Sequence, residues 1–324
     1  MKNKVCDILG IQYPILQGPM AWASDSRLAA AVSNAGGLGI MGIGFSPVEI
    51  FKAEIKKVKE LTDKPYGCNL ITAVPYADEL LDVILEEKVP VVELETMREF
   101  YHTLPEYTKK LKNAGVILIG KTASVEDAVV FEKAGVDIIS VKGADGGGHI
   151  YGFTGTFSLI PQVVDAVNIP VVNSSGVGDA RGIAASFMLG ADGVEIGSRF
   201  LLADECNVHD NYKKAIIESK EGDTAITGAS VGDAVRGLAN NLTEKVLKIE
   251  KQYEGKEAAE KIQELCSGCL RKAAVNGDVM EEGTVVVGQI AGSLNKRESV
   301  EMIMKELVTQ YEAIIANLLK YNFQ

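Results

Sequence analysis

The sequence has few cysteines and no long apolar segment, and each shortage excludes a class of protein. Its cysteines are odd in number and scattered: Cys6, Cys68, Cys206, Cys266 and Cys269. Such a set is unlike the disulfide framework of a small secreted domain. No apolar run approaches the roughly 20 residues of a membrane-spanning helix, and the basic N-terminal residues lead into no hydrophobic signal segment. We therefore expect a cytoplasmic protein without a membrane partner.

Positive charge is also scarce, with 33 Lys and Arg against 44 Asp and Glu, for a formal net charge of −11. Neutralising the phosphates of a nucleic acid requires a basic surface. We expect no nucleic-acid partner.

Cys266 and Cys269 form the sequence's single CxxC pair. A metal or iron–sulfur site needs further ligands, and no second CxxC or nearby histidine supplies them. We expect no metal site, and interpret the pair as two half-buried thiols on a helix, with a redox role as the alternative.

Short β-branched runs alternate with longer amphipathic segments between residues 12 and 202, a pattern typical of a parallel sheet with helical crossovers. The predicted strands are Pro14–Gln17, Gly37–Met41, Pro65–Leu70, Pro90–Leu94, Val116–Gly120, Val136–Val141, Pro170–Asn173 and Gly193–Ile196. The predicted helices are Ser26–Ala35, Pro47–Leu61, Tyr76–Glu87, Phe100–Ala114, Ser124–Ala134, Phe157–Val167 and Ala180–Leu189. Eight strand–helix units favour a closed TIM barrel, (β/α)8, over an open doubly wound sheet.

The alternation ends after residue 202, which predicts three parts of the chain. Residues 1–202 form the barrel, residues 203–284 form an extension or lid over its mouth, and residues 285–324 form a helical segment that packs on the barrel. In the last part Ile303, Leu307 and Tyr311 share one helical face. A contact between two copies of the chain is the less favoured use of that face. A homodimer is kept as an alternative to a monomer.

The segment from Lys142 to Gly152 is the clearest candidate site. It places Gly146, Gly147 and Gly148 directly before His149, after an apolar strand. Glycines let backbone N–H groups approach a ligand closely, and imidazole is suited to move a proton near neutral pH. The alternative is a surface loop with an incidental histidine.

Two further loops are candidates for binding phosphate. In TIM barrels a phosphate is commonly held after the seventh and eighth strands. Here those loops are Asn173–Asp179 and Glu195–Arg199, which offer small residues, free N–H groups and the hydroxyls of Ser175 and Ser198. Together they predict a site for one phosphate group.

In combination, five stretches resemble a known enzyme superfamily over nearly the whole chain. They are Gly18-Pro19-Met20-Ala21-Trp22, Ser33 to Gly39, Gly146 to His149, Ile196 to Phe200 and Gly288 to Gly292. The resemblance is to the FMN-binding barrels that include nitronate monooxygenase (2-nitropropane dioxygenase-like) and the flavin-dependent enoyl-acyl-carrier-protein reductase II of the FabK type. The reductase branch looks closer.

This resemblance implies FMN as cofactor and NAD(P)H as co-substrate. It implies that Gly18, Met20 and Ala21 lie against the isoalloxazine, that Asn69 bonds the ring or the ribityl chain, and that Gly147 lies near the flavin. It places Lys142 where relatives contact the cofactor through Glu or Gln. It implies that the phosphate end is held by Gly176, Glu195, Ile196, Gly197 and Ser198.

The resemblance also implies that His149 is the catalytic histidine. Our leading hypothesis is an FMN-dependent oxidoreductase that reduces the carbon–carbon double bond of an enoyl thioester in fatty acid synthesis, acting on a small-molecule or acyl-carrier-bound substrate. The alternatives are a nitronate monooxygenase and a catalytically altered module that binds flavin or acyl chains.

Charged residues at the strand ends depart from the reductase pattern. Glu93 and Glu95 replace a small neutral turn, and Lys121 and Lys142 end two later strands. Buried charges are costly unless paired, so we expect these four to compensate one another. Either they alter substrate choice or flavin electronics, or they only neutralise each other.

Overall fold

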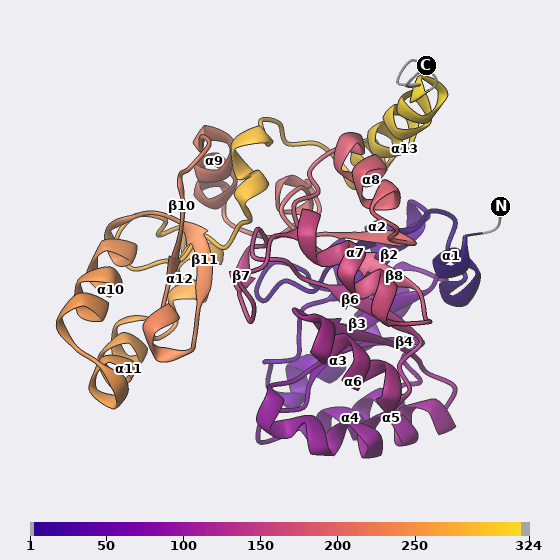
Figure 1. Cartoon of the computed structure of the whole chain (residues 1–324), viewed down its shortest axis with the longest axis horizontal. Coiled ribbons are helices and arrows are strands. Elements are labelled where there is room, and N and C mark those ends of the chain that lie inside the picture. The colour runs from indigo at the N-terminus through magenta and orange to yellow at the C-terminus, as the bar shows by residue number, and fades with distance from the viewer. Residues whose placement is uncertain (1–2, 319–324) are drawn as a thin grey trace.

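Eight parallel strands close into a barrel in the computed structural model, which describes residues 3–318 (Figure 1). The strands are β1 (Ile15–Gln17), β2 (Leu38–Met41), β3 (Tyr66–Ile71), β4 (Val91–Glu95), β5 (Ile117–Thr122), β6 (Ile138–Val141), β8 (Val171–Asn173) and β9 (Gly193–Ile196). Pairing of Ile15 with Val194 joins β1 to β9 and closes the sheet. The TIM-barrel prediction is confirmed, with every strand within two residues of its predicted bounds.

Amphipathic helices cover the outside of the barrel. They are α2 (Ser26–Asn34), α3 (Val48–Leu61), α4 (Ala77–Glu86), α5 (Leu104–Asn113), α6 (Val125–Ala134), α7 (Thr156–Ala166) and α8 (Ala180–Met188). The predicted helix Phe100–Ala114 is divided, because a 3-10 helix, η1 (Arg98–Thr103), precedes α5. Pro105 lacks a backbone N–H, so it suits the first turn of α5 and cannot continue a helix from η1.

A short helix that the sequence pattern did not reveal, α1 (Lys4–Leu9), closes the bottom of the barrel. Val5 and Leu9 are fully or almost fully buried against apolar side chains from inside the barrel, including Leu16, Ile119 and Ile138. Six residues are too few to show a helical period, so only the packing identifies this helix.

Inward-facing positions change from apolar to polar along the barrel. Successive inward-facing residues of a strand lie two positions apart. On four strands an apolar inward residue is followed, two positions nearer the carboxyl end, by a polar one: Val91 by Glu93, Ile119 by Lys121, Ile138 by Ser140 and Val172 by Ser174. The lower layer is a dry core, and the upper layer forms the floor of the barrel mouth.

Residues after the last barrel strand build a lobe beside this mouth (Figure 1). Its elements are η2 (Phe200–Leu202), α9 (Asp210–Glu218), β10 (Thr224–Thr227), η3 (Ala229–Val231), β11 (Val235–Leu238), α10 (Asn241–Gln252), α11 (Gly255–Leu265) and α12 (Cys269–Ala274). β11 pairs with β10 and with a two-residue strand, β7 (Gly148–His149). This small sheet, which the sequence analysis did not anticipate, attaches the lobe to the glycine loop of the barrel.

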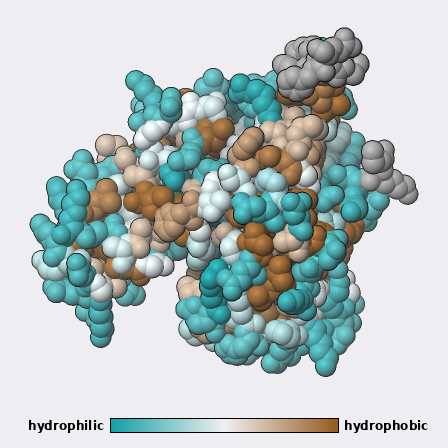
Figure 2. Space-filling view, viewed as in Figure 1, coloured by the Kyte–Doolittle hydropathy of each residue, from teal (hydrophilic) through white to brown (hydrophobic). Residues whose placement is uncertain are grey.

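The chain then returns to the barrel through η4 (Gln289–Ser293) and α13 (Val300–Ala316). α13 packs against α8 and α2, where Ile303 and Leu307 are buried and Tyr311 meets Phe187 edge to face. Among residues 3–318, no helix is long and apolar enough to cross a membrane. Figure 2 shows the molecular surface hollowed between the lobe and the barrel.

Candidate active site

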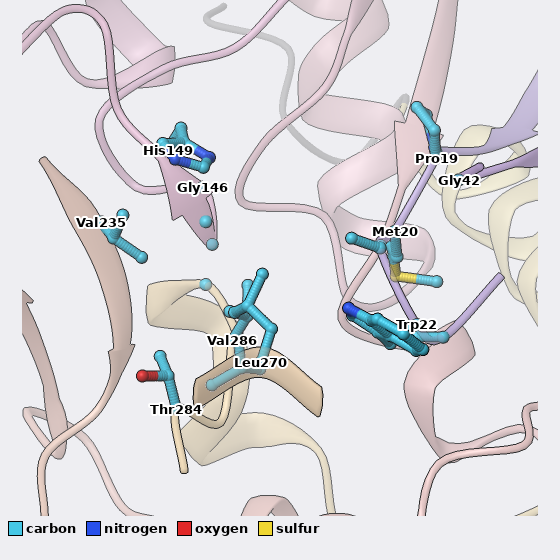
Figure 3. A pocket seen from close by; sticks show the side chains of 18 of the residues that line it. Pro19, Met20, Trp22, Gly42, Gly146, His149, Val235, Leu270, Thr284 and Val286 are labelled. Atoms are coloured by element: carbon cyan, nitrogen blue, oxygen red, sulfur yellow. The ribbon is translucent and has the colours of Figure 1, made fainter. Parts of the chain in front are cut away.

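A cavity of about 850 Å³ lies between the carboxyl ends of the barrel strands and the lobe. One wall comes from the loop after β1, with Met20 and Trp22, and the opposite wall comes from the lobe, with Val235, Leu270 and Val286 (Figure 3). The glycine loop and His149 border the same space. This volume lies within the range of pockets that bind cofactors and small substrates.

His149 is held in place by two contacts from outside the glycine triplet. Its Nε2 atom lies 3.3 Å from Oδ1 of Asp233, and its ring stacks on Tyr151 with centroids 6.1 Å apart and planes inclined by 8°. The hydrogen bond from His149 lowers the pKa of Asp233. A carboxylate bonded to one ring nitrogen orients the imidazole and leaves the other nitrogen for proton transfer.

The glycine loop packs against the last segment of the lobe, which lies between α12 and η4. A Cβ atom at Gly147 would lie 2.5 Å from the carbonyl carbon of Val287 and 2.7 Å from the nitrogen of Gly288. The N–H of Gly288 in turn donates to the Ser198 hydroxyl at 3.0 Å. Only glycine fits at position 147, and this contact fixes the loop against the Val287–Gly288 segment at the edge of the cavity.

Two neighbouring loops present backbone N–H groups to the cavity. Gly176 and Val177 follow β8, Gly197 and Ser198 follow β9, and all four line the pocket. Within residues 3–318 their N–H groups have no protein acceptor. Grouped free amides of this kind bind anions, so the donor set fits one phosphate. The Ser175 hydroxyl, which the sequence analysis expected to help bind phosphate, already donates a hydrogen bond to the Gly143 carbonyl.

The opposite end of the cavity fits a planar polar ring. Asn69 is almost fully buried, and its Oδ1 accepts a hydrogen bond from the Gly44 N–H at 2.7 Å. This bond directs the amide Nδ2, a donor, toward the cavity, which Gly18, Met20 and Ala21 also line. Trp22, in a left-handed conformation with φ of 65°, lies 5.9 Å from the Arg271 guanidinium and bridges the two walls.

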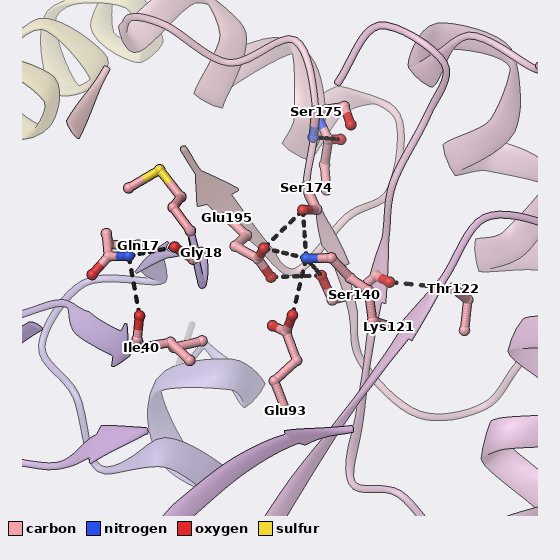
Figure 4. A network of polar contacts seen from close by, with 12 residues as sticks. Gln17, Gly18, Ile40, Glu93, Lys121, Thr122, Ser140, Ser174, Ser175 and Glu195 are labelled. Carbon is pink, nitrogen blue, oxygen red and sulfur yellow. Dashed lines mark hydrogen bonds and ion pairs between the residues drawn. The ribbon is translucent and has the colours of Figure 1, made fainter. Parts of the chain in front are cut away.

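A buried charge network forms the floor of the mouth (Figure 4). The Lys121 ammonium contacts Glu195 and lies 3.1 Å from Glu93 Oε1 and 2.8 Å from the Ser174 hydroxyl. Glu195 also accepts hydrogen bonds from Ser140 and Ser174, at 2.6 and 2.8 Å. One lysine and four polar partners are therefore locked together below the cavity.

The two carboxyl groups of this network have opposite protonation preferences. Burial alone would raise both pKa values, but Lys121 and its hydrogen bonds hold the pKa of Glu195 at about 2. Glu93 is fully buried, and burial together with the nearby Glu195 charge raises its pKa well above the ordinary range. The network therefore favours a Lys121–Glu195 ion pair beside a protonated Glu93.

Lys142 lies beside the glycine loop and forms no ion pair in the described part of the chain. Burial, and secondarily the charge of Lys121, lowers its pKa to about 8. Its ammonium is therefore a cation at the cavity edge that a ligand can neutralise.

The structure corrects two expectations from the sequence. The charge compensation does not join the four expected residues: Lys121 contacts Glu93, its charged partner is Glu195, and Lys142 and Glu95 form no ion pair among the described residues. Glu195 lies in this network and also lines the cavity, so its place at the phosphate end stays a prediction. The side chain of Ile196 is buried in the apolar layer outside the barrel, so it does not line the cavity.

The other predicted site residues, from Gly18 to Ser198, lie around the one cavity. Sequence reasoning missed Asp233 and the apolar lobe wall. Asp233 is far from His149 in the chain, and no motif marks it. The only sequence signal for the wall was the loss of the barrel pattern after residue 202.

Comparisons with known proteins agree with this geometry. The family model described as nitronate monooxygenase matches residues 2–310. A probable nitronate monooxygenase of Staphylococcus haemolyticus is 34% identical, covering 97% of this chain and 98% of the relative. The relative from Staphylococcus saprophyticus is 35% identical, covering 85% and 88%.

Solved structures are similar over the barrel and the lobe. FabK from Thermotoga maritima has a TM-score of 0.92 at 38% identity, covering 99% of this chain and 100% of that chain. Nitroalkane oxidase from Streptomyces ansochromogenes has a TM-score of 0.83 at 26% identity, covering 97% and 99%. Fold, site and relatives together define a TIM-barrel oxidoreductase. The chain belongs to the nitronate monooxygenase family, and this membership implies a flavin cofactor.

Proposed function

We propose that this protein is an FMN-dependent oxidoreductase that uses NAD(P)H to reduce the carbon–carbon double bond of an enoyl thioester. The observation that carries the proposal is the likeness to FabK, which includes the lobe as well as the barrel. The lobe supplies the apolar cavity wall of Val235, Leu270 and Val286. An acyl chain would bury apolar surface against this wall.

The proposed cofactor is FMN because the free amides after β8 and β9 can hold one terminal phosphate. When bound, FMN supplies hydride chemistry, accepting hydride from NAD(P)H and delivering it to the substrate. Asn69 Nδ2 would donate to the ring system, and Lys142 would place positive charge beside it. The proposal places the protein in the cytoplasm, where cysteines stay reduced.

His149 would supply the proton that completes the reduction. Asp233 orients its imidazole through Nε2, and stacking on Tyr151 limits rotation of the ring. The buried pair of Lys121 and Glu195 would keep the floor of the site rigid, because hydrogen bonds to Ser140, Ser174 and Glu195 fix the ammonium. The lobe would exclude water from the reacting end of the substrate.

Cofactor identity can be tested on protein purified from flavin-rich medium. Heat should release a ligand that chromatography identifies as FMN. Recovery of FAD, or of no flavin, contradicts the cofactor assignment.

The reaction is tested with two substrates under controlled oxygen. We expect anaerobic consumption of NADH or NADPH with a crotonyl thioester, at a rate that oxygen does not raise. Oxygen uptake with an alkyl nitronate and no reaction with the thioester would instead support the activity in the names of the Staphylococcus relatives. A yellow protein inactive with both substrates would support a flavin- or acyl-binding module.

A further inference from the structure

The CxxC pair of the lobe lies on the wall of the active-site cavity. Cys266 ends α11, Cys269 begins α12, and both line the cavity together with Ser267 and Gly268. Both thiols are free and half-buried. The pair is therefore divided between two helices by a turn, and does not lie on one helix as the sequence analysis expected.

The turn holds the two cysteines at a separation that a disulfide can span. The N–H of Cys269 donates to the Cys266 carbonyl at 3.0 Å, and Gly268 has the left-handed conformation, with φ of 69°. A four-residue turn keeps its end Cα atoms within about 7 Å, and disulfides join Cα atoms about 4.4–6.8 Å apart. The N–H of Thr284 also donates to the Cys269 carbonyl, which anchors the turn.

The surroundings of the two thiols differ. Cys266 follows the carbonyl end of α11, where the helix dipole disfavours a thiolate. The Cys266 thiol, and then the Thr284 hydroxyl, donate toward Cys269 and lower its pKa to about 6. By contrast, burial raises the pKa of Cys6, a half-buried thiol elsewhere in the chain, to about 11.

We propose that Cys266 and Cys269 form a dithiol site that small-molecule disulfides oxidise to an intramolecular disulfide. The Cys269 thiolate attacks one sulfur of the small disulfide, forms a mixed disulfide and releases one thiolate. The Cys266 thiol then loses its proton to solvent, attacks Cys269 Sγ and displaces the second thiolate. The protein pair loses two electrons, and the small disulfide is reduced to two thiols.

The site is independent of the proposed reductase activity, so its test does not use turnover. Folded full-length protein is incubated with oxidised glutathione, its free thiols are alkylated, and it is digested with trypsin. Cleavage after Lys261 and Arg271 gives one peptide, residues 262–271, that contains both cysteines. We expect this peptide to lose two hydrogen atoms and to resist alkylation, while Cys6 is alkylated.

Two serine variants test the order of the steps. Cys266→Ser should retain a stable glutathione adduct on Cys269, because no resolving thiol remains. In the Cys269→Ser variant, the remaining Cys266 thiol should react with oxidised glutathione no faster than Cys6 does in the same sample. Full alkylation of both cysteines in the wild-type peptide, or no adduct on Cys266→Ser, overturns the proposal.

Discussion

At the scale of single residues, His149 is positioned by groups from distant parts of the chain. We expect His149→Ala to keep its flavin, because the free amides that suit the phosphate lie on the loops after β8 and β9. Turnover should fall by about 10²–10⁴-fold, as is typical for loss of a general acid or base. The measurement is steady-state kinetics with flavin content determined by absorbance.

His209→Ala is the matched control for this variant. The His209 ring accepts a hydrogen bond from the Asn211 N–H at 3.1 Å and caps α9. Its loss should cost about 1 kcal/mol of stability and leave turnover unchanged. A His149→Ala enzyme within about threefold of wild type would remove His149 from the mechanism.

Glu93 gives a residue-scale prediction about pH. Because its pKa is raised in the folded protein, the folded state keeps a proton that the unfolded state releases above the ordinary carboxyl range. The contribution of Glu93 to stability therefore falls as pH rises through that range toward the raised pKa. Glu93→Gln resembles the protonated acid and lacks this loss.

We expect Glu93→Gln to match the wild type near pH 4 and to become more stable than it as pH rises toward 8. The measurement is urea unfolding of both proteins at several pH values, where each unit of pKa shift corresponds to about 1.4 kcal/mol. A wild type that gains stability over Glu93→Gln with rising pH would show that the ionised carboxylate stabilises the fold.

At the scale of elements, the contact between the glycine loop and the Val287–Gly288 segment couples the barrel to the lobe. Gly147→Ala would force these backbones apart, because its Cβ would lie 2.5 Å from Val287. We expect a loss of roughly 1–3 kcal/mol from overpacking together with weaker flavin binding. Urea unfolding and flavin titration measure the two effects.

Gly155→Ala is the matched control for this element. It lies just before α7, its φ is −68°, and a Cβ there has no neighbour closer than 3.9 Å. Its stability and flavin affinity should match the wild type. Equal behaviour of the two variants would mean that the loop can shift without cost.

At the scale of the whole molecule, one cavity is shared by the barrel and the lobe. A ligand that binds only the folded state stabilises it by about 2.7 kcal/mol at a hundredfold excess over Kd. Added FMN should therefore raise the Tm of flavin-free protein and slow proteolysis in the lobe as well as in the barrel. Riboflavin, which lacks the phosphate, is the control, and an equal effect of both would contradict the phosphate site.

The barrel could be predicted from the amino-acid sequence, because eight strand–helix units repeat a local pattern of burial. The same pattern located the carboxyl ends of the strands. Most of the site residues predicted at these ends line the cavity. These features depend on neighbours along the chain, where side-chain period and turn residues act directly.

Contacts between groups far apart in the chain could be seen only in the folded molecule. Asp233 reaches His149 because β11 pairs with β7. Lys121 on β5 meets Glu195 on β9 because inward-facing side chains from strands on different sides of the closed barrel converge at its centre. α1 is a helix because the bottom of the barrel offers its Val5 and Leu9 an apolar surface. Such contacts join residues far apart in the chain, and no local pattern encodes them.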